Sequence, residues 1–441
     1  MPLLRLITST ILGLGFFALP ILFDGKWTVP FDVLVSLLRN AAPSAVSAYA
    51  LVLIAAGALL SALAYRGRSP KAIEAFAAPL TFTVLRSIGL LLAIPLAFGI
   101  GPNWLLAKQT GGLMWGTLVS SIAIIIPLGA IVLNVLASYG CLELIGTMTR
   151  PLMRPLFRLP GRAALDDLTS WLGSYSVGLY LTRRLLDQGR YTRREAFTIV
   201  TCFSTVSIGF VAVVASTLDL LQVFPIVFGS YFVVVYLVAM IQVRLWPTTN
   251  VPNTYLATAD PEPEPTGSLF TAALLAAKAQ AARAQPLPKL MIEGLRDGII
   301  LAATILGTIL AVGLAAVLLA EHTPVFEWLG APIAPALDWL GLEDAERLAP
   351  AVTAGVTEMY IPALLVKDAP IAGRFFICLL SISQLVFFSS VGPMMLDMFR
   401  DLPIRLRDLL TIFLLRTALL VPILALWTQL LARAGAFDGL Q

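Results

Sequence analysis

An acid inside an apolar segment is the residue of this chain that most needs a chemical explanation. Glu358 lies in the stretch 348–366, which is mostly apolar. An ionised acid at mid-bilayer costs about 2.5–3.5 kcal/mol on insertion scales, so such residues usually act on ions or polar ligands. Glu358 could accept a hydrogen bond from a solute, coordinate a cation or carry a proton. The alternatives are structural: it neutralises Arg374 or Arg416, or it lies nearer the membrane surface.

The neighbours of Glu358 predict a break in a helix. Gly355, Glu358 and Pro362 fall at i, i+3 and i+7, and Thr357 and Tyr360 lie on the adjacent face. A glycine and a proline beside an acid are typical of an interrupted membrane helix, where freed backbone groups bind polar ligands. We therefore predict that Thr357, Glu358 and Tyr360 bind substrate.

A second polar stripe occurs in the apolar segment 168–186. Thr169, Gly173, Ser176 and Tyr180 follow one helical face at i, i+4, i+7 and i+11. Ser176 and Tyr180 are predicted site residues.

Polar side chains in neighbouring apolar segments complete the predicted site. They are Thr201, Ser204, Thr205, Ser381, Gln384 and Asn134. Small hydroxyls in membrane helices often pack helices together or bond to backbone carbonyls, and this alternative stays open for each of them. Thr201 and Ser204 have polar counterparts 180 residues further along the chain.

These residues belong to a motif that occurs twice. Pro155 and Pro335 keep the same spacing as Tyr180 and Tyr360 (335 − 155 = 180). Each copy contains an apolar helix, an amphipathic stretch with proline, a short broken apolar segment and another apolar helix. Duplicated, interrupted hydrophobic segments indicate a transporter-type site near the bilayer midplane.

Composition places these elements in a membrane. Hydrophobic residues make up 58% of the chain and charged residues 13%, whereas soluble domains carry roughly 25% charge. At about 20 residues per span, we predict an all-α polytopic protein with about nine transmembrane helices and two re-entrant hairpins, 168–186 and 348–366. The nine predicted spans are 3–23, 43–65, 76–100, 113–138, 195–217, 220–243, 296–320, 373–396 and 408–431.

Basic residues predict the orientation. Arg66, Arg68 and Lys71 follow the second span, so that loop and the N-terminus are expected in the cytoplasm. Arginines flank the first broken segment on both sides, whereas the lead-in to the second, 321–350, is acidic. The two copies therefore form an inverted-topology repeat. If one broken segment crosses the membrane fully, everything after it changes sides.

Two charged residues in other spans, Arg86 and Arg416, are expected to snorkel to an interface, with pairing to a membrane acid as the alternative.

Several classes of function are disfavoured by the residues present. The chain has no G-x-x-x-x-G-K-[ST] phosphate loop and a single histidine, His322, so neither a nucleotide motor nor a histidine metal site is expected. The net charge of +4 is explained by arginine-rich loops facing an anionic leaflet rather than by nucleic-acid binding. We expect no cofactor, no catalytic residues and no enzyme activity. We predict that transport is coupled to a cation, Na⁺ or H⁺.

The stretch Trp171–Tyr180, followed by Gly189–Ala196, resembles the nucleoside-recognition, or Gate, domain, and 351–374 looks like a diverged second copy. The chain as a whole resembles the YjiH-like branch of bacterial inner-membrane proteins. Similar domains occur in concentrative nucleoside transporters, ferrous-iron transporters and spore-maturation proteins. The resemblance implies a broken-hairpin site, ion-coupled uptake and often a homo-oligomer. Because no GTP-binding domain is present, an iron role is disfavoured.

The resulting prediction is a multi-pass inner-membrane transporter of a small polar solute, nucleoside-like by resemblance. The alternative is a non-transporting scaffold or a subunit of a hetero-complex. The predicted units are N-terminal scaffold helices (1–112), a first Gate-like repeat (113–217), a connecting helix and linker (218–295), a second, inverted repeat (296–396) and a C-terminal helix (397–441).

Overall fold

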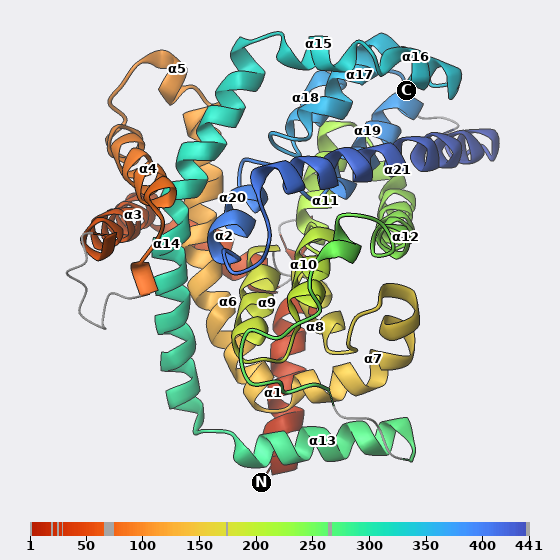
Figure 1. The fold of residues 1–441 in the computed structure, drawn as a ribbon. Helices are drawn as coiled ribbons and strands as arrows, with labels where there is room; N and C mark the ends of the chain where they lie inside the picture. Colours follow the sequence, from red (N-terminus) through yellow and green to blue (C-terminus); the bar gives the residue numbers. More distant parts are fainter. Residues whose placement is uncertain are drawn as a thin grey trace.

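The regular structure of the chain is almost entirely helical, as its apolar composition predicts (Figure 1). The computed structural model describes residues 2–18, 21–23, 26–28, 30–65, 75–172, 175–262 and 267–437. Near the N-terminus two strands, β1 (Ile21–Phe23) and β2 (Lys26–Thr28), pair antiparallel. The hairpin glycine Gly173 and the basic loop 66–71, both used in the predictions above, lie outside the described residues.

Six helices in the described part of the chain are long and apolar enough to cross a membrane. They are α3 (Pro43–Tyr65), α4 (Leu80–Phe98), η2 with α6 (Gly112–Val119 and Ser120–Ser138), η3 with α12 (Leu221–Val223 and Phe224–Gln242), α14 (Leu287–His322) and α21 (Leu406–Arg433). Each coincides with a predicted span. The chain is therefore a multi-pass membrane protein.

The other three predicted spans are shorter or interrupted. The segment 3–23 contains α1 (Pro2–Ala18), and the segments 195–217 and 373–396 are each split in two. The resulting helices are α10 (Arg193–Cys202), α11 (Ile208–Thr217), α19 (Ile371–Ser383) and α20 (Val391–Met398). Hydroxyl side chains favour the first break, because Ser207 caps α11 by accepting a hydrogen bond from the Phe210 amide at 3.4 Å.

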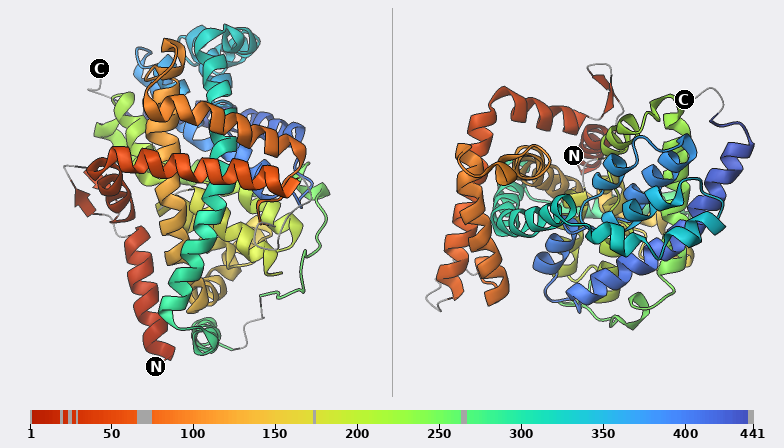
Figure 2. Two further views of the ribbon diagram at one scale, coloured as in Figure 1. Left: turned by 90° about the vertical axis from the view of Figure 1, so that its left-hand side faces the viewer. Right: turned by 90° about the horizontal axis from the view of Figure 1, so that it is seen from above.

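Helix α14 is the element against which the N-terminal helices pack. It contacts α3, α4 and α6, and Figure 2 shows α3 and α4 crossing it rather than running beside it. Small residues allow this close approach: a Cβ atom on Gly57 would lie 1.8 Å from the Ala303 carbonyl oxygen, and one on Gly89 would lie 2.1 Å from that of Gly307. Such contacts between backbones are typical of membrane helices.

Shorter helices form two series in the same order. The first series is α7 (Cys141–Phe157), α8 (Ala163–Leu172) and α9 (Tyr175–Asp187), followed by the broken α10 and α11. The second series is α15 (Val325–Gly330), α16 (Ala334–Trp339), α17 (Ala345–Ala354) and α18 (Ile361–Leu365), followed by the broken α19 and α20. The remaining helices are α2 (Pro30–Ala41), α5 (Asn103–Leu106), η4 (Thr248–Asn250) and α13 (Leu269–Arg283).

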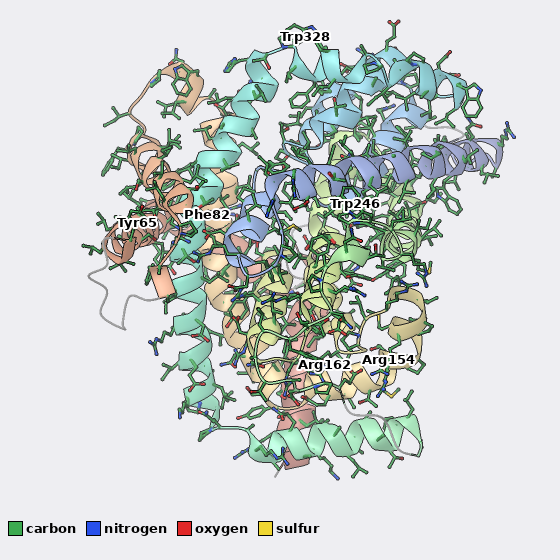
Figure 3. The ribbon with its side chains drawn as sticks, viewed as in Figure 1. Tyr65, Phe82, Arg154, Arg162, Trp246 and Trp328 are labelled. Atoms are coloured by element: carbon green, nitrogen blue, oxygen red, sulfur yellow. The ribbon has the colours of Figure 1, made fainter. Side chains whose placement is uncertain are left out.

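The two series lie toward opposite ends of the molecule. Arg154 of α7 and Arg162 before α8 lie at the end opposite Trp328 of α15 (Figure 3). The basic and acidic segments of the sequence are therefore separated in space.

The expectation that Arg86 and Arg416 snorkel is wrong. Their side chains are 1% and 0% exposed. Arg86 forms a bidentate ion pair with Asp397, at 2.7 and 2.8 Å, so the pairing alternative holds for this residue. Arg416 instead donates to the Gln242 side-chain oxygen at 2.9 Å and to the Ser383 carbonyl at 2.5 Å. Buried partners replace the membrane interface in both cases.

Candidate functional site

A cavity of about 460 Å³ lies where the N-terminal helices meet the broken elements. Glu358 and Tyr360 line it from the link between α17 and α18, and Tyr175 lines it from the start of α9. Ser207 of the α10–α11 break and Arg39 of α2 also line it, and most of the remaining wall is apolar. A mostly apolar cavity of this size with a few convergent polar groups is typical of small-molecule sites.

Among the described residues that line this wall, Glu358 is the only one with a carboxylate, and it is 3% exposed. Its carboxylate accepts a short hydrogen bond from the backbone amide of Tyr360. The two arginines considered as neutralising partners are engaged elsewhere, Arg374 with Asp219 at 3.2 Å and Arg416 with neutral oxygens. No ion pair between described residues includes Glu358, so its charge is available to a ligand or a proton.

The link that carries Glu358 is held by the break between α19 and α20. The amides of Phe388 and Ser389 donate to the carbonyls of Val356 and Thr357, both at 2.7 Å. A Cβ atom on Gly355 would lie 1.8 Å from the side-chain oxygen of Gln384. A larger residue here would require the Gln384 side chain to move, so the interrupted segments of the second series pack closely against each other.

The two series meet at the site through side chains. The hydroxyl groups of Tyr175 and Ser390 lie 2.7 Å apart in a hydrogen bond, and those of Tyr360 and Thr217 lie 2.9 Å apart. The Tyr175 ring also packs edge-on against Phe387, with centroids 5.7 Å apart. Each bond joins one series to the other, so movement of either series affects the cavity.

The structure brings some predicted site residues to the cavity and places others elsewhere. Glu358 and Tyr360 line it, and the Thr357 hydroxyl next to them donates to the Ala354 carbonyl at 2.7 Å. Ser176 lies one residue after Tyr175 and donates to the Met394 sulfur at 3.9 Å. Tyr180 lines a different cavity.

The remaining predicted residues bond within the protein. Thr201 and Ser381 donate to carbonyls of their own helices at 2.7 and 3.0 Å, and Ser204, just after α10, donates to the Val200 carbonyl of that helix at 2.7 Å. Asn134 donates to the Leu290 carbonyl at 2.6 Å. These bonds are those that the packing alternative expects, and a role for these side chains in a site stays a prediction.

Gln384 and Thr205 contact other elements. Gln384 donates to the Val352 carbonyl and to the Thr417 hydroxyl, both at 2.9 Å. Thr205 donates to Asp167 at 3.4 Å. Both residues therefore hold the broken helices in place, and any contact of theirs with a solute also stays a prediction.

Sequence reasoning missed two adjacent buried acids in α8. Asp166 and Asp167 are 1% and 5% exposed, and no ion pair between described residues includes them. Asp166 accepts hydrogen bonds from Thr182 at 2.6 Å and Tyr191 at 2.5 Å. Asp167 accepts from Thr205 and, over a short distance, from Tyr236 of α12. The acids join α8 to α9, to α12 and to the segments before α10 and before α11. The signal for them was two adjacent acids just before the apolar segment 168–186.

Tyr175 and Ser207 were also missed. Tyr175 lies within the stretch that resembles the Gate domain, and Ser207 occupies the N-cap position of α11. Tyr175 is the first residue of α9 and Ser207 lies just before α11, so both occupy helix starts, where helical spacing carries little information.

A family model and a relative match this chain. Residues 119–221, which contain α6 to α11, match the family model described as Gate, nucleoside recognition. An uncharacterized protein of Alkalihalophilus pseudofirmus is 30% identical over 433 residues, covering 96% of this chain and 93% of the relative. The chain belongs to the same family as this protein.

The family likeness extends well beyond the Gate match, because the aligned 433 residues include the N-terminal helices and the second series. The resemblance of 171–196 to the Gate domain is confirmed, since this stretch lies inside the matched residues. No solved structure matches the chain. Assignment to the YjiH-like branch stays a prediction.

Proposed function

We propose that this Gate-domain protein is a secondary transporter of a small polar solute, and that the cavity around Glu358 holds the solute. The observation that carries the proposal is an acid, 3% exposed and without an ion-pair partner, on the wall of a 460 Å³ cavity where the two series meet. Burying such an acid is costly, and its hydrogen bonds to backbone amides at the start of α18 leave its charge without a counter-ion among the described residues.

The cavity wall fits a neutral solute that carries both a ring and hydrogen-bond donors. Tyr175, Phe210 and Tyr360 supply aromatic surface, and Phe210 and Tyr360 lie edge to face with centroids 6.5 Å apart. Glu358 can accept hydrogen bonds from hydroxyl or amino groups, while Arg39 can donate. A nucleoside combines these features, which agrees with the description of the matched family model.

We further propose that α8 with α9 and α17 with α18 are re-entrant hairpins of an inverted repeat. Their positions toward the basic and the acidic end of the molecule support this proposal (Figure 1). By the positive-inside tendency, the end with Arg154 faces the cytoplasm of a bacterial cell. Movement of the hairpin-bearing elements against α4, α6 and α14 would expose the cavity alternately to each side, coupled to Na⁺ or H⁺.

Uptake into proteoliposomes tests the proposal. A panel of labelled nucleosides is offered to the wild-type protein, to Glu358→Gln and to Glu346→Gln as matched control, since Glu346 is an exposed acid of α17. We expect uptake by the wild type and the control, and at least tenfold slower uptake by Glu358→Gln at equal amounts of folded protein. Wild-type uptake by Glu358→Gln would refute the role of this acid.

A different result would favour the alternative. Stable co-purification with another membrane protein, together with no uptake of any nucleoside or of any metabolite that changes when the protein is deleted, indicates a scaffold or subunit. In that case the cavity is not a transport site.

A further inference from the structure

A second cavity, of about 1050 Å³, lies along the same boundary and shares no lining residue with the first. One wall consists of α4 and α14, and the other of α9, α20 and the residues after α20. Four arginines and four aspartates line it: Arg86, Arg183, Arg184, Arg400, Asp187, Asp297, Asp397 and Asp401. Several of these opposite charges form ion pairs, either across the two walls or within one wall.

One pair connects the walls and is fully buried. Arg86 of α4 and Asp397 of α20 are each 1% exposed and form two hydrogen bonds, at 2.7 and 2.8 Å. Arg86 also donates to the Ser61 hydroxyl at 2.6 Å, and Thr308 of α14 donates to Asp397 at 3.5 Å. Bonds from α4 and α14 thus hold α20 at this point, and α3 supports the Arg86 side chain.

A second group is paired within a single wall. Arg183 of α9 forms ion pairs with Asp187 at 2.6 Å and with Asp401 at 2.7 Å. It also donates to the Met398 carbonyl at 2.8 Å. These bonds join α9 to the end of α20, so the two helices move as one wall.

Two opposite charges on facing walls remain without such bonds. The Nη1 atom of Arg184 is buried and has no hydrogen-bond partner among the described residues. Asp297 of α14 is exposed to the cavity and forms no hydrogen bond or ion pair with described residues, although Arg184 is close enough to act on it electrostatically. Tyr180, one turn before Arg184, is 7% exposed, and its hydroxyl lies close to the Arg184 side chain.

The paired and the unpaired groups lie along one face of α14. Asp297, Thr304 and Thr308 follow each other at i, i+7 and i+11, the spacing of a single helical face. Eleven residues at 1.5 Å each separate Asp297 from Thr308 by about 16 Å. The bonded contact and the open pair are therefore at different heights of the same cavity.

We propose that Arg184 and Asp297 form an ion-pair gate that closes this cavity in the other state of the transport cycle, while Arg86 and Asp397 hold the walls together as a pivot. The inference rests on the proposed function, because it requires the α9–α20 wall to move against α4 and α14. Approach of the walls removes water from two opposite charges, and this strengthens their attraction.

Cross-linking tests the approach of the walls. The full chain carrying Arg184→Cys and Asp297→Cys is reconstituted in liposomes, and a short bifunctional thiol reagent is added. The native cysteines Cys141, Cys202 and Cys378 are buried and free, so they compete little. The matched control carries Arg183→Cys and Asp297→Cys, because Arg183 neighbours Arg184 but points to Asp401.

We expect the 184–297 pair to cross-link at least tenfold faster than the 183–297 control, and cross-linking to lower the thiol labelling rate of Thr304→Cys inside the cavity at least tenfold. Equal cross-linking rates, or unchanged labelling, overturn the gate. Charge exchange gives a second test: Asp297→Arg with Arg184→Asp should restore at least half of the uptake that Asp297→Arg alone abolishes.

The outcomes separate the two proposals. Cross-linking and labelling need no transported solute, so a positive result in a protein without uptake supports the moving walls but refutes transport. Uptake by the wild type without cross-linking refutes the gate alone. If the charge-exchange variant fails to fold, the cross-linking result decides.

Discussion

Removing the carboxylate of Asp397 is the most sharply defined perturbation of this structure. Asp397→Asn leaves the Arg86 guanidinium 1% exposed, with the Ser61 hydroxyl and the Phe76 carbonyl as its remaining strong partners. Breaking a buried ion pair on one side costs about 3–5 kcal/mol, because the remaining charge is uncompensated. We expect a loss of unfolding free energy in this range.

The measurement is equilibrium unfolding of the purified full chain in mixed micelles of increasing SDS content, followed by far-UV circular dichroism. Asp187→Asn is the control, since Asp187 pairs with Arg183 at exposures of 51% and 24%. An exposed pair contributes at most about 1 kcal/mol. Replacing both buried partners by Leu and Met removes the charge as well as its partner and should recover at least half of the loss.

The reasoning is refuted if Asp397→Asn costs no more than Asp187→Asn. It is also refuted if the double replacement is as unstable as the single one, because the penalty would then come from lost packing rather than from an unpaired charge.

Three further variants have expected outcomes. Gly355→Ala forces Gln384 to move and should cost about 1–3 kcal/mol of unfolding free energy. Gly229→Ala is the control and should not destabilise the protein, because a Cβ atom at Gly229 would meet no atom within 4 Å. Equal effects of the two substitutions would contradict the close approach at Gly355. Thr192→Ala removes the capping box of α10 and should cost about 1 kcal/mol in the same unfolding titration, with an unchanged stability as the contrary result. Tyr175→Phe removes the hydrogen bond to the N-cap of α20 and should cost about 0.5–1.5 kcal/mol; a gain in stability would contradict a favourable bond.

The long apolar helices could be predicted from the sequence because about 20 consecutive apolar residues leave few alternatives in a bilayer. The interruptions at 203–207 and 384–390 could not be predicted in the same way. Hydropathy averages over a window, whereas a break depends on which partners satisfy the freed backbone groups. In the second break those partners are the carbonyls of Val356 and Thr357, about 30 residues away in the chain.

The candidate site was predicted in part for a similar reason. Glu358 stands out locally, because one acid in an apolar segment carries its own energetic signal. Arg86 and Asp397 are 311 residues apart and carry no local signal of their pairing. Tyr175 lines the cavity only because the breaks bring the two series together, and such contacts depend on tertiary packing.

The glycine contacts of α14 decide which boundary of the molecule can slide. At Gly57 and Gly89 the backbones of α3 and α4 face that of α14 without side chains between them. Backbones in direct contact have no side-chain rotamers through which to adjust, so we expect α3, α4 and α14 to form one rigid unit. The wall formed by α9 and α20 meets α4 and α14 through charged side chains such as Arg86 and Asp397. One glycine contact also occurs near this boundary, where Gly313 of α14 lies close to the Ser389 carbonyl just before α20. We therefore expect the proposed transport motion at the boundary lined by charged side chains, and not between α14 and α3 or α4.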